Sequence, residues 1–95
     1  MTITREELAA QVDEAHWEWL RAHLERGGII VVDRGLDVAE VGLKIAADDT
    51  AAIRALLDGK QLGKPSAEQI AAWDTDPSLR FSTLIISPYV LIQEQ

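Results

Sequence analysis

The chain has 95 residues and a formal net charge of −7, from 9 lysines and arginines against 16 aspartates and glutamates. This length predicts a single domain, 1–95. The basic residues are scattered singly, a pattern that excludes a nucleic-acid surface and disfavours an anionic membrane. The chain has no cysteine, which excludes disulfides and thiolate chemistry and fits a reducing cytoplasm.

The ends and apolar runs of the sequence favour a cytoplasmic protein. The first residues lack the basic stretch and apolar core of a secretory signal. The longest apolar runs, Ile29–Val32 and Leu84–Ile86, are far shorter than the roughly 20 residues that a membrane helix needs. We therefore expect no contact with a membrane.

The first third of the chain predicts helix. Thr4 and Glu7 have the spacing of a capping box, which opens a short helix to about Gln11. Asp13 can cap a second helix over Asp13–Arg26, and the sequence leaves open whether Val12–Glu14 is a break or a continuation.

The helix over Asp13–Arg26 has two apolar stripes on different sides. At 100° per residue, one stripe consists of Trp17, Leu20 and Leu24, and the other of Ala15, Trp19 and Ala22. A helix of this kind is covered on two sides, by its own core and by a partner.

A strand and a turn follow this helix. Gly27 and Gly28 end it, because glycine readily takes the left-handed conformation of a helix C-cap. The four β-branched or apolar residues of Ile29–Val32 predict a strand buried on both faces, and Asp33–Gly35 predict the turn after it.

Two more helices are expected next. Asp37 and Glu40 form a capping box, with Leu36 and Val41 as a hydrophobic staple, before a core stripe that includes Ile45. Asp48–Thr50 then cap another helix. Its inward residues are predicted to be Ile53, Leu56 and Leu57, and Gly59 is predicted as its left-handed cap.

The remaining elements alternate between strand and helix. Residues 61–64 are a short strand or an extended connection, and Ser66 with Gln69 predicts a helix that ends before Pro77. Trp73 on this helix and Trp17 on the earlier one fall on core stripes, so both are predicted to pack in the core. Residues 80–93 are one long strand, or two segments bent at Pro88. The fold class is α+β: a small mixed β-sheet of two to four strands covered by four or five short helices. Ile29–Val32 is expected to pair beside Leu84–Ile86, because both apolar segments are predicted to be covered on both faces.

Few residues have the spacing of a catalytic or metal site. His16 and His23 lie seven apart on the predicted helix, about 10 Å along its axis, too far to share a metal ion, so no metal is predicted. Asp33 and Asp37 follow the central strand, where ligand sites of α/β sheets gather, and are the catalytic candidates. Helix capping and a turn also explain them.

Ligand motifs are equally sparse. No glycine-rich phosphate loop is present, so no cofactor is predicted. Lys60 and Lys64, near a helix start, form a weak anion site. Trp19 on the second stripe, His23 beside it and Tyr89 after the predicted bend form the expected interaction surface.

Several segments together resemble a known family. They are W-E-W-L from Trp17, I-I-V-V-D from Ile29, L-D-V-A-E-V from Leu36, I-A-A-D-D from Ile45, K-P-S-A-E-Q from Lys64 and S-P-Y-V-L-I-Q from Ser87. The chain resembles, over nearly its whole length, a family of short bacterial proteins, some from photosynthetic bacteria, described only as a domain of unknown function. The resemblance implies a bacterial, cytoplasmic, stand-alone domain and carries over no activity or site residue.

These observations leave three hypotheses. The first is a non-enzymatic binding or interaction module that acts as a homodimer and has an unknown protein partner or small ligand. A chain this short has few elements to cover both apolar stripes of the helix Asp13–Arg26 and the apolar C-terminal segment, so a second copy is expected to cover part of them. The alternative is a small hydrolase or isomerase using carboxylates near Asp33 and Asp37. The third is an acidic mimic that occupies a nucleic-acid-binding protein, although carboxylates at helix starts explain part of the negative charge.

Overall fold

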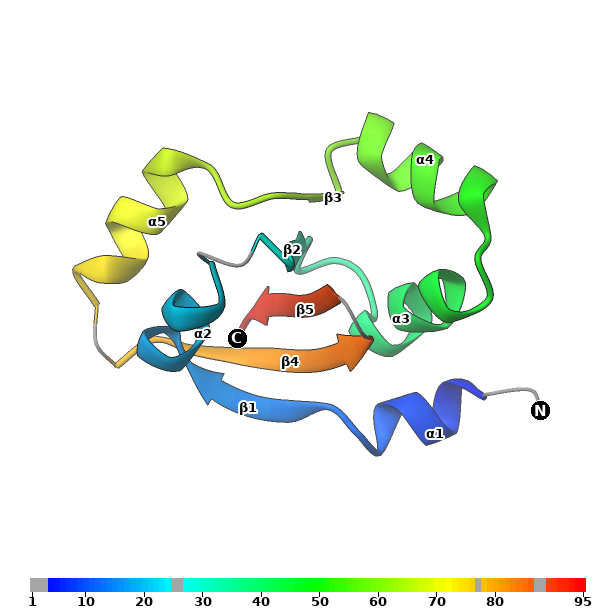
Figure 1. Ribbon diagram of the computed structural model, residues 1–95, viewed down its shortest axis with the longest axis horizontal. Coiled ribbons are helices and arrows are strands. Elements are labelled where there is room, and N and C mark those ends of the chain that lie inside the picture. Colours follow the sequence, from blue (N-terminus) through cyan, green and yellow to red (C-terminus); the bar gives the residue numbers. More distant parts are fainter. Residues whose placement is uncertain (1–3, 25–26, 77, 87–88) are drawn as a thin grey trace.

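The computed structural model describes residues 4–24, 27–76, 78–86 and 89–95. They form an α+β fold with five helices and one five-stranded mixed sheet, so the fold class is confirmed but the predicted limit of four strands is wrong (Figure 1). The helices are α1 (Arg5–Ala9), α2 (Trp17–Leu24), α3 (Val38–Ala46), α4 (Thr50–Asp58) and α5 (Ala67–Asp74). The strands are β1 (Asp13–His16), β2 (Ile29–Val32), β3 (Leu62–Gly63), β4 (Arg80–Ile86) and β5 (Tyr89–Glu94).

The sheet has the strand order β1-β4-β5-β2-β3. β5 pairs with β2 in parallel, and every other neighbouring pair is antiparallel. β1 and β3 are therefore the two edges. The expected pairing of Ile29–Val32 beside Leu84–Ile86 is wrong, because β5 lies between these two segments and pairs with both. Of the two alternatives for residues 80–93, the two separate segments are correct, and Pro88 itself lies outside the described residues.

The fifth strand is the part of the chain that was predicted as the start of a helix. Asp13–His16 pairs with Arg80–Thr83, so the second helix begins only at Trp17. Two consequences correct the sequence analysis. The helix no longer includes Ala15 or His16, and its second apolar stripe is reduced to Trp19 and Ala22, both exposed. Pairing with a strand more than 60 residues away overrides the local preference of residues 13–16.

Four predicted helix starts, at Thr4, Asp37, Asp49 and Ser66, are confirmed by their capping bonds, whereas the start predicted at Asp13 is wrong. The Thr4 hydroxyl caps α1. Ser66 and Gln69 form the complete capping box, in which each side chain accepts a hydrogen bond from the other residue's backbone N–H, at 3.0 and 2.9 Å. The Asp37 carboxylate accepts from the Ala39 N–H at 2.9 Å. These bonds satisfy amides that the first turn of a helix leaves without partners.

The fourth helix differs from its prediction. Asp49 caps α4 as expected, but Leu57 is 49% exposed and no residue of α4 is fully buried, because α4 packs mainly against α3 and β3 at one border of the fold. Gly59 does occupy the C-cap, with an ordinary φ of −80°. The left-handed residue is Lys60, at φ 59°.

Side chains from alternate strand positions form two cores on opposite faces of the sheet. One core joins α1, α3 and α4 to the sheet; its fully buried residues are Leu8, Val32, Val38, Ala39, Val41, Leu62, Leu84 and Leu91. The other joins α2 and α5 to the opposite face; its residues are Trp17, Leu20, Ile29, Trp73, Phe81, Val90 and Ile92. Figure 1 shows α2 and α5 toward one end of the sheet and α1 and α3 toward the other. The strand Ile29–Val32 alternates between the two cores, as a strand covered on both faces should.

Within the described ranges, no helix has the length and apolar character needed to cross a bilayer.

Candidate binding groove

A groove of about 600 Å³ lies where β1, β4 and α2 meet. It is lined by Gln11, Asp13, Glu14, Ala15, His16, Trp19, Thr83 and Ile85. Asp13 is directly opposite Thr83 in the antiparallel pair, so both belong to the sheet face that carries α2 and α5. These two helices cover the Phe81 end of β4 and leave the Ile85 end open.

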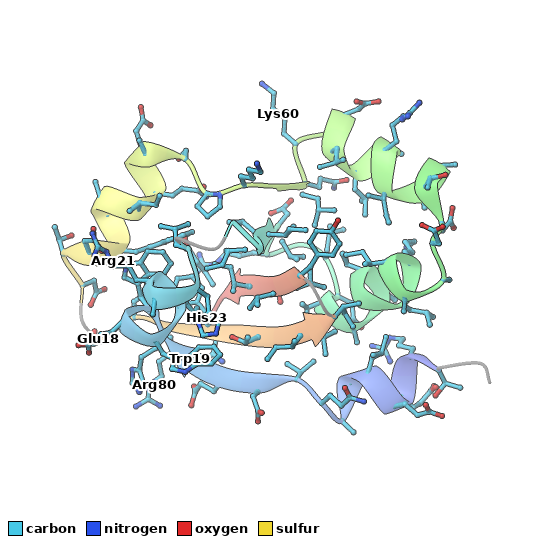
Figure 2. The ribbon with its side chains drawn as sticks, viewed as in Figure 1. Glu18, Trp19, Arg21, His23, Lys60 and Arg80 are labelled. Atoms are coloured by element: carbon cyan, nitrogen blue, oxygen red, sulfur yellow. The ribbon has the colours of Figure 1, made fainter. Side chains whose placement is uncertain are left out.

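The direct passage from β1 into α2 places Trp19 over this opening. Trp17 and Leu20 point into the core, at 4% and 0% exposure, and Trp19 is two positions, or about 200°, around the helix from Trp17. Trp19 therefore points outward and is 47% exposed. Figure 2 shows its ring beside that of His23, and the ring centroids are 4.3 Å apart.

A cluster of aromatic rings and hydrogen bonds fixes the orientation of α2. The indole N–H of Trp17 donates to Asp74 Oδ1 at 2.7 Å, and Arg21 Nε reaches the same oxygen at 2.9 Å. The ring of Trp17 packs edge-on against that of Trp73, at 4.8 Å between centroids. Trp73 in turn donates to Glu94 Oε1 at 2.6 Å. The prediction that Trp17 and Trp73 belong to the core is confirmed.

Ile85 is the second exposed apolar residue of the groove. It is 55% exposed, although the sequence predicts that Leu84–Ile86 is covered on both faces. The prediction fails at Ile85 because neither α2 nor α5 reaches this end of β4, whereas Leu84 is fully buried against the other core. A strand made only of apolar residues does not show where its covering helix ends.

Thr83 gives the groove an unusual polar residue. It is 4% exposed, and its hydroxyl has no hydrogen-bond partner among the described residues. A buried hydroxyl without a partner costs free energy, so such groups are uncommon in folded proteins. Sequence analysis missed Thr83, because a threonine inside a strand is an ordinary β-forming residue.

The charged residues of the groove are acidic. Asp13 and Glu14 line it, and among the residues that the structure describes no lysine or arginine does. Arg80 Nη1 lies 3.3 Å from Glu14 Oε2, so the Glu14 charge is partly compensated. Asp13 takes part in no ion pair within the described part of the chain.

The two carboxylates predicted as catalytic candidates have different surroundings. Asp37 caps α3 and forms an ion pair with Arg5, which lowers the pKa of the Asp37 carboxyl. A carboxylate with a lowered pKa is a weak base. The Asp33 backbone carbonyl accepts from Gln93 Nε2 at 2.8 Å and from the Leu36 N–H at 3.0 Å, which builds the expected turn, and its side chain is exposed.

The two lysines predicted as an anion site share a separate, shallow hollow. Lys60 and Lys64 both line it, and so do Asp33 and Ser66. Figure 2 shows the Lys60 side chain extending away from the molecule. Ser66 and Gln69 already cap the nearby helix start.

The predicted interaction surface is divided by the structure. Trp19 and His23 lie together at the groove. Tyr89, 42% exposed, is opposite Ile86, whose side chain packs on the α1–α3 core, so Tyr89 lies on the other face of the sheet. In the described residues, no three histidine, aspartate or glutamate side chains are grouped as metal ligands.

Comparisons with known proteins agree with the fold. A family model described as a protein of unknown function (DUF2288) matches residues 3–94. An NMR solution structure of PA1075 from Pseudomonas aeruginosa is similar, with a TM-score of 0.80 and 29% sequence identity over 93% of this chain and 81% of that one. No curated protein matches the chain.

Proposed function

The chain belongs to this family of unknown function (DUF2288), whose description names no activity, so we propose from its own surface that it is a small non-enzymatic binding module. The observation that carries this proposal is the groove, where Trp19 of α2 and Ile85 of β4 both expose apolar side chains. Tryptophan is enriched among the residues that dominate binding energy, and apolar hollows with a few polar groups are typical ligand sites. We place the module in the bacterial cytoplasm, which the absence of cysteine supports.

The alternative, a hydrolase or isomerase using Asp33 and Asp37, has less support. An acid–base pair needs at least one group that exchanges protons near neutral pH. The Asp37 carboxyl instead has a lowered pKa and is engaged with Arg5 and the start of α3. Asp33 lines the shallow hollow that also contains Lys60 and Lys64, and it does not line the groove.

We also propose that the module acts as a homodimer through the outer edge of β1. β1 pairs with β4 on one side, and residues 13, 14 and 16 are exposed. Two-fold antiparallel pairing places side chains of the same face opposite each other. If Ala15 is opposite its own copy, Glu14 of each copy lies opposite His16 of the other, which is favourable. Moving the centre to Glu14 would instead place two carboxylates together.

Charge reversal at this edge tests the dimer by sedimentation velocity at micromolar concentration. We expect Glu14→Lys to weaken the dimer, because it removes the carboxylate that faces His16 of the other copy. The double variant Glu14→Lys/His16→Glu should restore the dimer, since it places opposite charges across the edge. Glu68→Lys, at an exposed position of α5, is the control for a change in net charge. A wild-type chain that remains monomeric, or a Glu14→Lys variant that dimerises normally, contradicts the edge-paired dimer. The groove would still be available as a binding surface.

A further inference from the structure

We propose that the groove binds a small organic cation, a protonated amine on an apolar body. The inference rests on the proposed function, because it takes the groove as the binding surface, but it does not require the dimer. Three observations support it: the apolar residues of the groove, the sign of its charges and the hydroxyl beneath it.

Trp19 and Ile85 would contact the apolar part of the ligand. Both are about half exposed and line the same groove. Its volume of about 600 Å³ is typical of sites for small molecules. Tryptophan is also the side chain whose ring attracts a cation most strongly.

The charge of the ligand is set by Asp13. Its side chain leaves β1 on the groove face of the sheet, opposite Thr83, whereas the side chains of Glu14 and His16 leave the other face. Asp13 takes part in no ion pair within the described residues, so it can serve as the counter-ion of a cation and would repel an anion. The net charge of −7 adds a long-range attraction for cations.

The hydroxyl of Thr83 supplies a hydrogen-bond acceptor. Thr83 lines the groove opposite Asp13, and its oxygen lacks a partner among the described residues. The oxygen itself is buried, so rotation about the Cα–Cβ bond is needed to exchange it with the methyl group and present it to a ligand. Two N–H groups of an ammonium can then donate, one to the threonine hydroxyl oxygen and one to the Asp13 carboxylate.

A metal cation does not fit this arrangement. Asp13 and Glu14 are consecutive residues of a strand, so their side chains leave opposite faces and do not converge on one ion. No group of three potential ligands exists within the described residues. A cation carried on an apolar body uses Trp19 and Ile85 as well, which a bare ion does not.

Three compounds with the same phenylethyl body and different charges test the inference. They are phenethylamine, 2-phenylethanol and 3-phenylpropanoate, titrated into the ¹⁵N-labelled 95-residue chain at about pH 7.5, where the amine is protonated and the carboxylic acid is ionised. We expect saturable shifts of the Asp13, Trp19 and Ile85 amides with the amine. The alcohol should bind about tenfold more weakly and the carboxylate without saturation.

Variants of exposed residues assign the effect to the groove. Asp13→Asn should weaken amine binding about tenfold and leave alcohol binding unchanged, whereas Trp19→Leu should weaken both. Glu68→Gln on α5 is the matched carboxylate control and should bind the amine like the wild-type chain. All three positions are exposed, and an unchanged pattern of remote amide shifts verifies the fold.

The outcomes separate this inference from the proposed function. If the alcohol or carboxylate binds the groove as tightly as the amine, the cation inference is wrong and the groove remains a binding surface. If none of the three compounds shifts the groove amides, both the cation inference and the binding role of the groove are contradicted. Amine-induced shifts that survive Asp13→Asn unchanged also overturn the inference.

Discussion

Replacing Thr83 with valine is expected to stabilise the protein. Valine has nearly the same shape as threonine, with a methyl group in place of the hydroxyl, and both residues are β-branched and suit a strand. Thr83 is 4% exposed and its hydroxyl has no partner among the described residues. The substitution therefore removes a desolvated polar group without breaking a known hydrogen bond.

The size of the effect follows from two contributions. A buried polar group without a partner costs about 1–3 kcal/mol, and an additional buried methyl group contributes about 0.8 kcal/mol. Because Thr83 lies at the edge of a groove that water can enter, we take the lower end and expect a gain of about 1 kcal/mol in the free energy of unfolding. For a domain of this size, the gain corresponds to an increase in Tm of about 4–8 °C.

Urea denaturation followed by tryptophan fluorescence measures this difference, because Trp17 and Trp73 are buried in the core. The midpoint should rise at an unchanged m value. Thr83→Ser is the matched control: it keeps the hydroxyl, removes the methyl group and should lower stability by about 1 kcal/mol. A valine variant less stable than the wild-type chain would refute the reasoning, because it would mean that the hydroxyl has a partner in solution.

Four further predictions concern α3 and Trp19. Gly42→Ala should lower the free energy of unfolding in urea by about 1–3 kcal/mol, because the new Cβ would lie 2.5 Å from Cδ2 of buried Leu84. A gain in stability would show that the Leu84 side chain moves to make room. Asp37→Ala should lower the free energy of unfolding by about 1 kcal/mol, and Asp37→Asn should lower it less, because asparagine still caps α3. Equal losses for the two variants would contradict the capping role. The pKa of Asp37 is lower in the folded chain than in the unfolded chain. Its contribution to stability is therefore present above the unfolded pKa of about 4 and is lost as the pH falls through the folded pKa. Arg5→Ala should raise the folded pKa of Asp37 in an NMR titration, and an unchanged pKa would exclude the ion pair. Trp19→Phe should remove most of the acrylamide-accessible fluorescence, since the other two tryptophans are at most 4% exposed, and accessible fluorescence that persists would mean that one of them is open to solvent.

The helix starts could be predicted because their signals are local. Thr4, Asp37 and Ser66 each bond to amides two or three residues away, so the sequence spacing contains the whole interaction. The same holds for Gly27, whose φ of 76° fits the predicted left-handed position. None of these depends on how distant segments meet.

The elements that were missed depend on distant segments. Asp13–His16 becomes a strand only because Arg80–Thr83 lies beside it, and no period in residues 13–16 signals that partner. The neighbours of β2 could not be identified either, because β4 and β5 are both apolar and both suit a central position.

The candidate groove could be predicted only in part. Trp19 was predicted as part of an interaction surface because it lies off the core stripe of its helix, a local property, and it is 47% exposed. Ile85 and Thr83 join it through strand pairing and through the point at which α2 stops covering the sheet. That point depends on the packing of Trp17 and Trp73, which the sequence alone does not determine.

The position of β5 also affects how this chain can fold during synthesis. Tyr89–Glu94 is the last of the ten elements to be translated, yet it occupies the centre of the sheet between β4 and β2. Until it leaves the ribosome, β2 and β4 lack the strand that joins them, and both cores lack the residues that β5 contributes to them. Nascent chains that stop before residue 89 should therefore remain unfolded, and the sheet should form only in one late step, at a rate limited by the long loops that this pairing closes.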